Sequence, residues 1–200
     1  MRVRAEGSLV GLLGDRPATG RAAHPYARLA VEVVARGRRG SGYLVGEDTV
    51  LTAAQPVRRA SRIVVHLDTG QPGAREVLAA VVWLDVDADL AVLRLTPGAA
   101  APVPPAPTRY ARMTSRPASL DVSTSLGAET ETVVGASSDT YDIAAEARPG
   151  AVAFAGGLAV GVVTARDRYT VARLDHHLGH ARSGRRLAAL LEAGPLVDVA

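Results

Sequence analysis

Short apolar segments, most of them rich in β-branched residues, alternate with polar or glycine- and proline-containing breaks along the first half of the chain. Gly46–Glu47–Asp48 and Gln71–Pro72–Gly73 are breaks of this kind. Segments of strand length between such breakers are typical of β-strands, and no helical pattern of about 10–15 residues separates them. The pattern predicts six strands, at 29–35, 42–45, 49–51, 62–67, 76–84 and 90–95.

Residues 96–108 interrupt this pattern with five of the twelve prolines of the chain. Proline fixes φ and lacks the N–H that a strand ladder needs, so we expect an extended connector here. A second strand-rich half follows, in which Gly156–Gly157 between two apolar runs is a hairpin signal. Strands are predicted at 118–124, 129–136, 141–145, 151–155, 158–164 and 169–174.

The chain closes on a helical pattern. Leu187, Leu190 and Leu191 have the spacing i, i+3, i+4, and Gly194–Pro195 supplies a stop, which predicts a helix over 185–193. The whole pattern predicts an all-β fold of two six-stranded antiparallel β-barrels with a C-terminal α-helix. The expected division is an N-terminal arm (1–27), a first barrel (28–95), a proline-rich linker (96–108), a second barrel (109–175), and a C-terminal helix and tail (176–200).

Composition narrows the class of protein. With 48% hydrophobic and 22% charged residues among 200, the chain has the balance of a globular protein rather than a disordered one. The longest apolar run, 77–84, is far shorter than the about 20 residues of a membrane-spanning helix. The first residues lack the pattern of a secretory signal, and the absence of cysteine excludes disulfides, thiolate metal sites and a cysteine nucleophile. We expect a cytoplasmic protein without a membrane partner.

The net charge of +3 and the pI of about 9.8 invite a nucleic-acid interpretation. However, all 23 basic residues are arginines, and they occur in ones and twos rather than in a block. Without lysine or cysteine few groups titrate between neutral pH and the pI, so a small excess of arginine raises the pI strongly. The charge pattern therefore favours a protein, peptide or small-molecule partner over nucleic acid.

Two stretches of the first half carry a specific resemblance. Residues 40–45 (GSGYLV) and 49–54 (TVLTAA) resemble the run that precedes the catalytic histidine in trypsin-like serine proteases, especially the bacterial HtrA-like branch. The next residue here is Gln55. Residues 85–95 (DVDADLAVLRL) resemble the strand region of the catalytic aspartate, which the resemblance assigns to Asp89.

The second half carries the third landmark of that family. Residues 147–154 (ARPGAVAF) and 156–164 (GGLAVGVVT) resemble the nucleophile loop and the strands after it, which places Pro149 at the serine. The reaction needs a hydroxyl that attacks and an imidazole that relays its proton, and neither glutamine nor proline supplies them. Proline also lacks the N–H of an oxyanion hole, and Ala147 replaces a glycine of that loop. The resemblance therefore implies a catalytically inactive homologue.

A substrate-binding groove can remain in a homologue that lacks the catalytic residues. The resemblance places 162–166 on the strand whose edge pairs with substrate, and pairing by β-augmentation uses main-chain groups. Arg166 stands where relatives often keep a glycine, so its side chain narrows the groove or favours an acidic ligand. Asp89 is expected to bond main-chain donors and help dock the two halves. We expect a pseudoprotease that acts as a scaffold or as a regulatory or recognition subunit, with ligand-binding candidates Gln55, Asp89, Tyr141, Asp142, Thr164, Ala165 and Arg166.

Two alternatives stay open. A non-proteolytic enzyme acting on a small molecule would use polar groups of the old cleft, and it needs an apolar pocket with convergent polar groups. A serine hydrolase with a relocated nucleophile would use Ser137 or Ser138. Those serines stand at an expected turn, where serine is ordinary, and do not precede the apolar hairpin. The polar candidates for the first alternative are Gln55, Asp89, Tyr141 and Asp142.

The run Asp175–His180 (DHHLGH) is the candidate for metal binding. His176 and His180 would share one face of a helix at i, i+4, a spacing that can hold Zn²⁺ or Ni²⁺. Gly179 weakens a helix there, and no further ligand is apparent upstream. We therefore predict no metal site and no cofactor.

Overall fold

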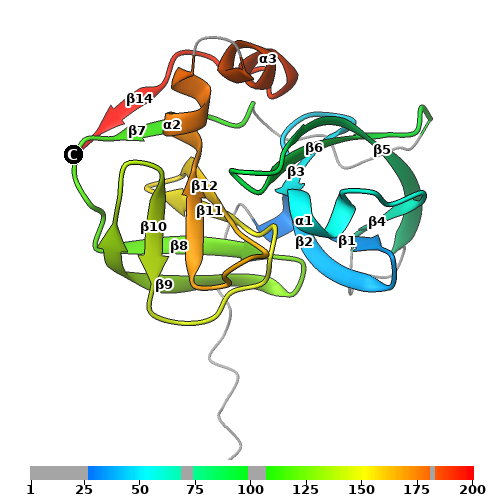
Figure 1. Ribbon diagram of the computed structural model, residues 1–200, viewed down its shortest axis with the longest axis horizontal. Helices are drawn as coiled ribbons and strands as arrows, with labels where there is room; N and C mark the ends of the chain where they lie inside the picture. The colour runs from blue at the N-terminus through cyan, green and yellow to red at the C-terminus, as the bar shows by residue number, and fades with distance from the viewer. Residues whose placement is uncertain (1–26, 69–73, 99–106, 181–182) are drawn as a thin grey trace, which may run out of the picture.

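The computed structural model describes residues 27–68, 74–98, 107–180 and 183–200. They form two closed six-stranded barrels side by side, with short helices and a two-stranded sheet at one end (Figure 1). The predicted fold class, two six-stranded antiparallel barrels followed by a C-terminal helix, is therefore confirmed. The expected N-terminal arm, apart from Ala27, and most of the proline-rich linker lie outside the described residues.

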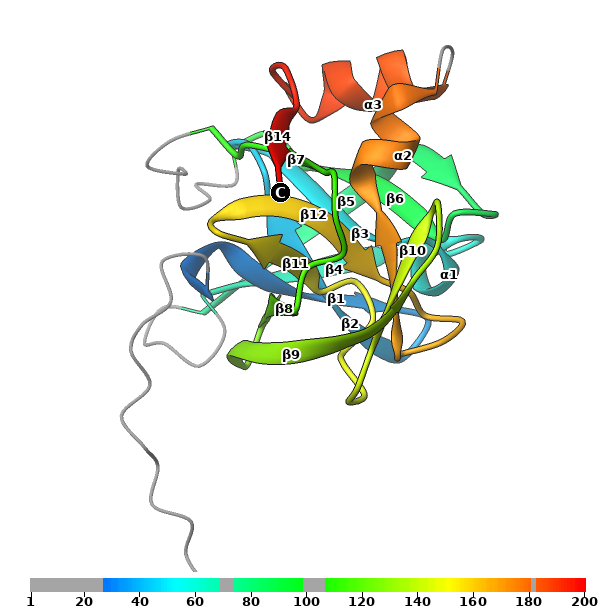
Figure 2. The same cartoon turned by 90° about the vertical axis from the view of Figure 1, so that its left-hand side faces the viewer.

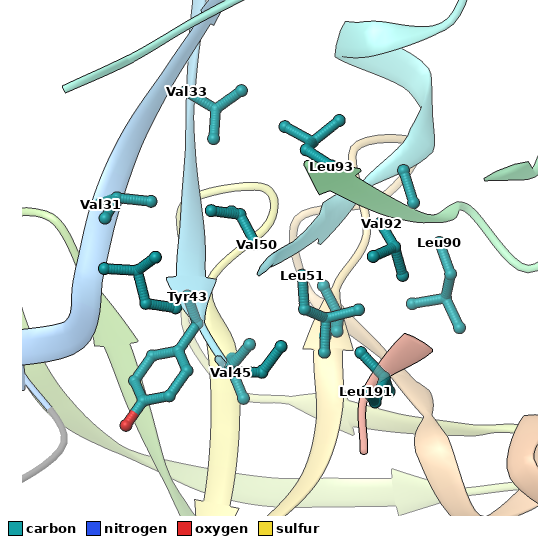
Figure 3. Packing of buried hydrophobic residues seen from close by; sticks show 14 of the residues in the cluster. Val31, Val33, Tyr43, Val45, Val50, Leu51, Leu90, Val92, Leu93 and Leu191 are labelled. Carbon is teal, nitrogen blue, oxygen red and sulfur yellow. The ribbon is translucent and has the colours of Figure 1, made fainter. Parts of the chain in front are cut away.

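The first barrel closes in the strand order β1–β2–β3–β6–β5–β4. Val31 and Val33 of β1 are buried and pack against the apolar side chains of β3 and β6 in its interior (Figure 3). The long strand β5 is mostly exposed or half-buried along its length, and among its residues only Trp83 is classed as buried. The strands are β1 (Ala30–Ala35), β2 (Arg38–Leu44), β3 (Thr49–Ala53), β4 (Ile63–Leu67), β5 (Arg75–Asp85) and β6 (Leu90–Leu95).

The second barrel closes in the order β10–β13–β12–β11–β8–β9. Counted from its own first strand, this is the same cyclic order as in the first barrel, so the topology repeats although the sequence shows no repeat. The strands are β8 (Ser119–Thr124), β9 (Gly127–Ala136), β10 (Thr140–Ile143), β11 (Val152–Ala155), β12 (Leu158–Val163) and β13 (Thr170–Arg173).

Two hairpin turns have the geometry that their sequences allow. Gly156 and Gly157, between β11 and β12, have φ of 54° and 88°, which confirms the predicted hairpin. Arg36 and Gly37, between β1 and β2, have φ of 53° and 73°. Positive φ at both central residues is the signature of a type I′ turn, whose twist matches that of the flanking strands. Arg36 is unusual at such a position.

In the described ranges, three α-helices accompany the barrels: α1 (Ala54–Val57), α2 (Leu174–Gly179) and α3 (Ser183–Leu190). Helix α3 begins and ends earlier than the predicted 185–193. It can include Gly184 because the bare Cα packs against α2, where a Cβ would lie 2.6 Å from the carbonyl oxygens of His177 and Leu178. A 3₁₀ turn, Ala27–Leu29, precedes β1. None of the helices in the described part of the chain is long and apolar enough to span a membrane; the cytoplasmic location stays a prediction.

The expected C-terminal tail is partly a strand. Residues Val197–Val199 form β14, which pairs in parallel with β7 (Ala111–Met113) just after the linker (Figure 2). The pairing joins the chain end to the entrance of the second barrel.

One apolar cluster crosses from the first barrel into the second. It includes Tyr43 of β2 and Phe154 of β11, whose ring centroids are 5.1 Å apart. Leu191, after α3, is buried in the same cluster (Figure 3). Because buried apolar area is the main favourable contribution to folding, this shared cluster stabilises the relative position of the barrels. The cleft residues are therefore held on a common core.

Candidate functional site

Asp89 connects the two barrels through main-chain groups. It lies in the turn between β5 and β6 with φ of 55° and is 2% exposed. Its Oδ1 accepts the N–H of Gln55 at 2.7 Å, and its Oδ2 accepts the N–H of Ala165 at 2.6 Å. Charge-assisted hydrogen bonds of this length are strong. Asp89 therefore holds the start of α1 and the segment after β12 at a fixed separation, which is the docking contact expected from the sequence.

Gln55 lies in the first turn of α1, directly after Ala53–Ala54 at the end of β3. Its side chain is exposed, and its bond to Asp89 comes from the main-chain N–H. The side chain makes no hydrogen bond with any described residue. An amide here can donate and accept hydrogen bonds with a ligand, but it acts neither as an acid nor as a base near neutral pH.

Pro149 occupies a tight turn that fits it well. The Ala151 N–H donates to the Arg148 carbonyl at 3.1 Å, and Gly150 has φ of 82°. Proline at the second position and glycine with positive φ at the third are the preferences of a type II turn. The Pro149 carbonyl accepts the Ser41 N–H at 2.7 Å, which ties this turn to β2 of the first barrel.

Two main-chain N–H groups of this loop are bonded inside the protein. Ala147 donates its N–H to the Arg168 carbonyl at 2.9 Å, and Gly150 donates its N–H to the Val163 carbonyl at 2.8 Å. Pro149 has none. An oxyanion hole needs free donors aimed at the developing charge. The loop from 147 to 150 offers no such pair in this conformation.

The Arg148 side chain anchors the loop from 147 to 150 through two polar contacts. Its guanidinium lies 3.5 Å from the Glu32 carboxylate on β1 and 3.0 Å from the Ser125 hydroxyl after β8. Glu32 is buried and also pairs with Arg39 at 3.0 Å. The turn carrying Pro149 is therefore fixed by contacts to both barrels.

The expected groove strand differs from its prediction. β12 pairs with β11 on one side and with β13 on the other, so Val162 and Val163 have no open edge. Thr164 is buried, and its hydroxyl donates to the Asp167 carbonyl at 2.7 Å instead of facing a ligand. The barrel closes because β13 returns beside β12, which the sequence pattern alone does not reveal. Only Ala165 and Arg166, beyond β12, stay at the cleft.

Arg166, beyond β12 of the second barrel, contacts the β5–β6 turn of the first barrel. Its guanidinium donates to the Val86 carbonyl of the β5–β6 turn at 2.6 Å, while the side chain remains exposed. Together with the Asp89–Ala165 bond, this contact bridges the two barrels at adjacent residues. Whether Arg166 narrows a groove or favours an acidic ligand stays a prediction.

Tyr141 and Asp142 do not join the other candidates. Both lie on β10, where neighbouring side chains point to opposite faces. The Tyr141 ring is buried under the Arg173 guanidinium, 4.9 Å from the ring centroid, and burial raises the pKa of its hydroxyl. Asp142 is exposed. No contact among the described residues links either side chain to Gln55 or Asp89, so the structure does not assemble the four-residue polar set of the small-molecule alternative.

The remaining candidates lie elsewhere. Ser137 is in the turn between β9 and β10, where its hydroxyl donates to Asp139 at 2.8 Å and lowers the pKa of that carboxyl. His176 lies in α2 and His180 directly follows its end, and their Nε2 atoms are 3.0 Å apart. Within the described ranges no group of three or more His, Cys, Asp or Glu residues is arranged to hold a metal ion.

A cavity of about 410 Å³ opens beside Gln55, and its positively charged lining was not predicted from the sequence. Four arginines line it, from two chain segments about twenty residues apart. The doublet Arg58–Arg59 was visible in the sequence, but its proximity to Arg36 and Arg38 depends on how α1 packs beside the β1–β2 hairpin. We call this cavity the arginine pocket; its lining residues are Arg36, Arg38, Gln55, Pro56, Arg58 and Arg59.

Comparison with known proteins was made at the level of sequence families and of solved structures. Residues 40–184 match the family model described as trypsin-like peptidase domain. No match to a curated protein sequence was found.

Several crystal structures share the fold. The active form of the Rv3671c protease from M. tuberculosis has a TM-score of 0.59 and 21% identity, over 86% of this chain and 84% of that chain. Deg5 gives 0.61 and 17%, over 74% and 85%. The MamO protease domain from Magnetospirillum magneticum gives 0.55 and 17%, over 75% and 93%. At these identities the likeness concerns the fold.

Proposed function

Because the chain belongs to the trypsin-like peptidase domain family, yet carries Gln55 and Pro149 at the positions that resemble those of its histidine and serine, we propose that it is a pseudoprotease. It binds a peptide or a segment of a protein at the cleft between the barrels and does not hydrolyse it. In this role it serves as a scaffold or as a recognition subunit for another protein.

One observation carries this proposal: the loop that resembles the nucleophile loop is built to be static. Pro149 has neither hydroxyl nor N–H, the Ala147 N–H is bonded to Arg168, and the Pro149 carbonyl is bonded to Ser41. Loss of one oxyanion donor alone lowers rates by about 10²–10³. The missing nucleophile and base add to that loss, since an amide cannot relay a proton.

The cleft nevertheless keeps groups that can contact a ligand. Gln55 presents an exposed amide, and the Arg166 guanidinium contacts the Val86 carbonyl. Binding energy does not require the chemical step, and main-chain or side-chain contacts from a rigid frame suffice for recognition. The small-molecule alternative lacks this support, because the cavity beside Gln55 is lined mainly by arginines rather than by apolar side chains.

A peptide-binding selection tests the proposal. The purified protein is used to select binders from a random peptide array, and the selected peptides are then incubated with it and weighed by mass spectrometry. We expect binders that stay intact and whose affinity changes in Arg166→Glu and Arg166→Gly, because Arg166 borders the cleft. Arg185→Glu on α3, an exposed arginine without a described partner, is the charge-matched control and should leave affinity unchanged.

Two results would overturn it. Selected peptides that are cleaved by the protein would show that hydrolysis persists. Binding that responds equally to Arg166→Glu and Arg185→Glu, or to neither, would show that the cleft is not where peptides bind.

A further inference from the structure

The arginine pocket concentrates positive charge beside Gln55. Its four guanidinium groups come from the β1–β2 hairpin (Arg36 and Arg38) and from the residues that follow α1 (Arg58 and Arg59). α1 packs next to β1 and β2 (Figure 1), so these two segments share one wall of the first barrel. The pocket thus adjoins the residue that stands in the position of the family's histidine.

Among the described residues, no carboxylate lies within ion-pair distance of Arg36, Arg38, Arg58 or Arg59. Other arginines do have such partners: Arg39 pairs with Glu32, Arg94 with Asp48 and Arg173 with Asp175. Four like charges around one cavity repel each other, and an anion in the cavity relieves that repulsion.

Two of the four are also held in an unfavourable backbone conformation. Arg36 has φ of 53° and Arg59 has φ of 59°, in the left-handed region that disfavours residues with a Cβ. Type I′ turns such as that at Arg36 prefer Asn, Asp or Gly. Non-glycine residues kept in such conformations cluster at functional sites. Two of the residues that line the pocket are therefore held in a left-handed backbone conformation.

We propose that the arginine pocket binds the acidic side chains of a peptide segment. The inference rests on the proposed function and names its ligand class: a peptide whose carboxylate or phosphoryl oxygens enter the pocket while its backbone follows the cleft past Gln55. The guanidinium fork matches both kinds of oxyanion bidentately.

The surroundings favour a peptide over nucleic acid. The pocket contains no aromatic side chain on which a base could stack. It is also a single compact cavity, and several arginines outside it are neutralised by carboxylates, including Arg39, Arg75, Arg94 and Arg148. A nucleic-acid backbone needs an extended stripe of free positive charge.

The test is a fluorescence-anisotropy titration of the whole protein with three labelled peptides. One carries four consecutive glutamates, one carries glutamines in their place, and one carries phosphoserines. We expect the glutamate and phosphoserine peptides to bind and the glutamine peptide not to. The relative affinity of the two anionic peptides then identifies whether carboxylates or phosphoryl groups are the better ligand.

Matched double variants locate the binding. Arg36→Gln/Arg58→Gln should weaken binding of the anionic peptides by about tenfold or more, because it removes two charge-assisted contacts. Arg38→Gln/Arg59→Gln should do the same and covers the case in which the first variant misfolds. Arg109→Gln/Arg185→Gln, which removes the same net charge from exposed sites outside the pocket, should change affinity by less than about twofold.

Equal weakening by the pocket variants and the control variant would overturn the proposal, because it would show general attraction to net charge. Tighter, pocket-dependent binding of an oligothymidylate would overturn it in favour of nucleic acid. If array-selected peptides bind in an Arg166-dependent way but glutamate confers no advantage over glutamine, the pocket proposal fails and the proposed function stands. If the glutamate peptide binds through the pocket but neither displaces an array-selected peptide nor responds to Arg166→Glu, the proposed function fails.

Discussion

At the scale of single residues, Asp89 has a structural role that needs no catalytic partner. Both carboxylate oxygens accept main-chain N–H groups, one from each barrel, and the carbonyl of the same residue accepts the Ala54 N–H at 3.0 Å. A buried carboxylate that accepts this many hydrogen bonds holds the donating segments in place. Its retention therefore does not depend on catalysis.

Replacing Asp89 by asparagine should destabilise the protein. The amide can accept from only one of the two N–H groups and turns its own NH₂ toward the other, which leaves a buried donor without an acceptor. We expect the free energy of unfolding to fall by about 2–4 kcal/mol, measured by urea denaturation. Asp87→Asn, at an exposed position in the same turn, should change it by less than about 0.5 kcal/mol. Equal values for the two variants would contradict the role given to Asp89.

Residue chemistry was predictable from the sequence where it depended on side-chain type alone. The resemblance located Gln55, Asp89 and Pro149, and their functional groups follow from their identity. The directions of the Ala147 N–H and the Thr164 hydroxyl were not predictable, because their acceptors, the carbonyls of Arg168 and Asp167, are set by loop geometry. The arginine pocket was missed for a similar reason, since its members come from separate segments.

At the scale of elements, the turn around Pro149 and Gly150 is the tightest junction between the barrels. A Cβ on Gly150 would lie 2.0 Å from the Ser41 carbonyl oxygen and 2.5 Å from the Thr52 hydroxyl, and φ is 82°. Only glycine fits both the contact and the conformation. The turn therefore depends on both residues. Pro149 suits the second position of a type II turn, and Gly150 provides the positive φ and the space that the third position requires.

Gly150→Ala should lower the free energy of unfolding by about 3 kcal/mol or more, since the methyl group forces the barrels apart and the residue is held at positive φ. Gly156→Ala isolates the second cause: its φ is 54°, but no atom lies within 4 Å of the added Cβ. That control should lose only about 1 kcal/mol in the same chemical denaturation. A smaller loss for Gly150→Ala than for Gly156→Ala would be incompatible with the packing described.

Helix α2 gives the stability of the protein a pH dependence. Burial and the neighbouring charges of His176 and His180 lower the pKa of His177 from 6.5, while Asp85 and Asp139 act in the opposite direction. The unfolded chain therefore takes up this proton at a higher pH than the folded protein does. Stability from neutral His177 is complete above about pH 6.5 and falls as the pH drops through the folded pKa.

Urea denaturation between about pH 7.5 and about pH 5 should show this loss, and His177→Gln should reduce the slope of stability against pH. An unchanged slope in the variant would mean that other groups carry the dependence.

The strands of both barrels were largely predictable because most of them are apolar runs between breakers. Helices α1 and α2 were not predictable from the sequence. Four and six residues are too few to display helical periodicity. The β7–β14 pair was also missed, since its three-residue strands lie more than eighty residues apart in the chain. Such pairing is decided by the path of the whole chain.

At the scale of the molecule, two barrels of the same strand order are joined by side-chain contacts from several elements. Tyr43 packs against Phe154, Glu32 pairs with Arg148, and Arg166 bonds the Val86 carbonyl. The chain thus has the double-barrel frame of the trypsin-like peptidase domain family, with Gln55 and Pro149 at the positions that resemble those of its histidine and serine. The account predicts a rigid cleft that recognises without cutting.

Fluorophosphonate labelling followed by intact-mass spectrometry tests this claim most directly, because the reagent reacts with activated serines. The account predicts that the protein keeps its unmodified mass under conditions that label an active serine protease completely. A stoichiometric adduct on any serine, Ser137 and Ser138 included, would demonstrate an activated nucleophile and contradict it.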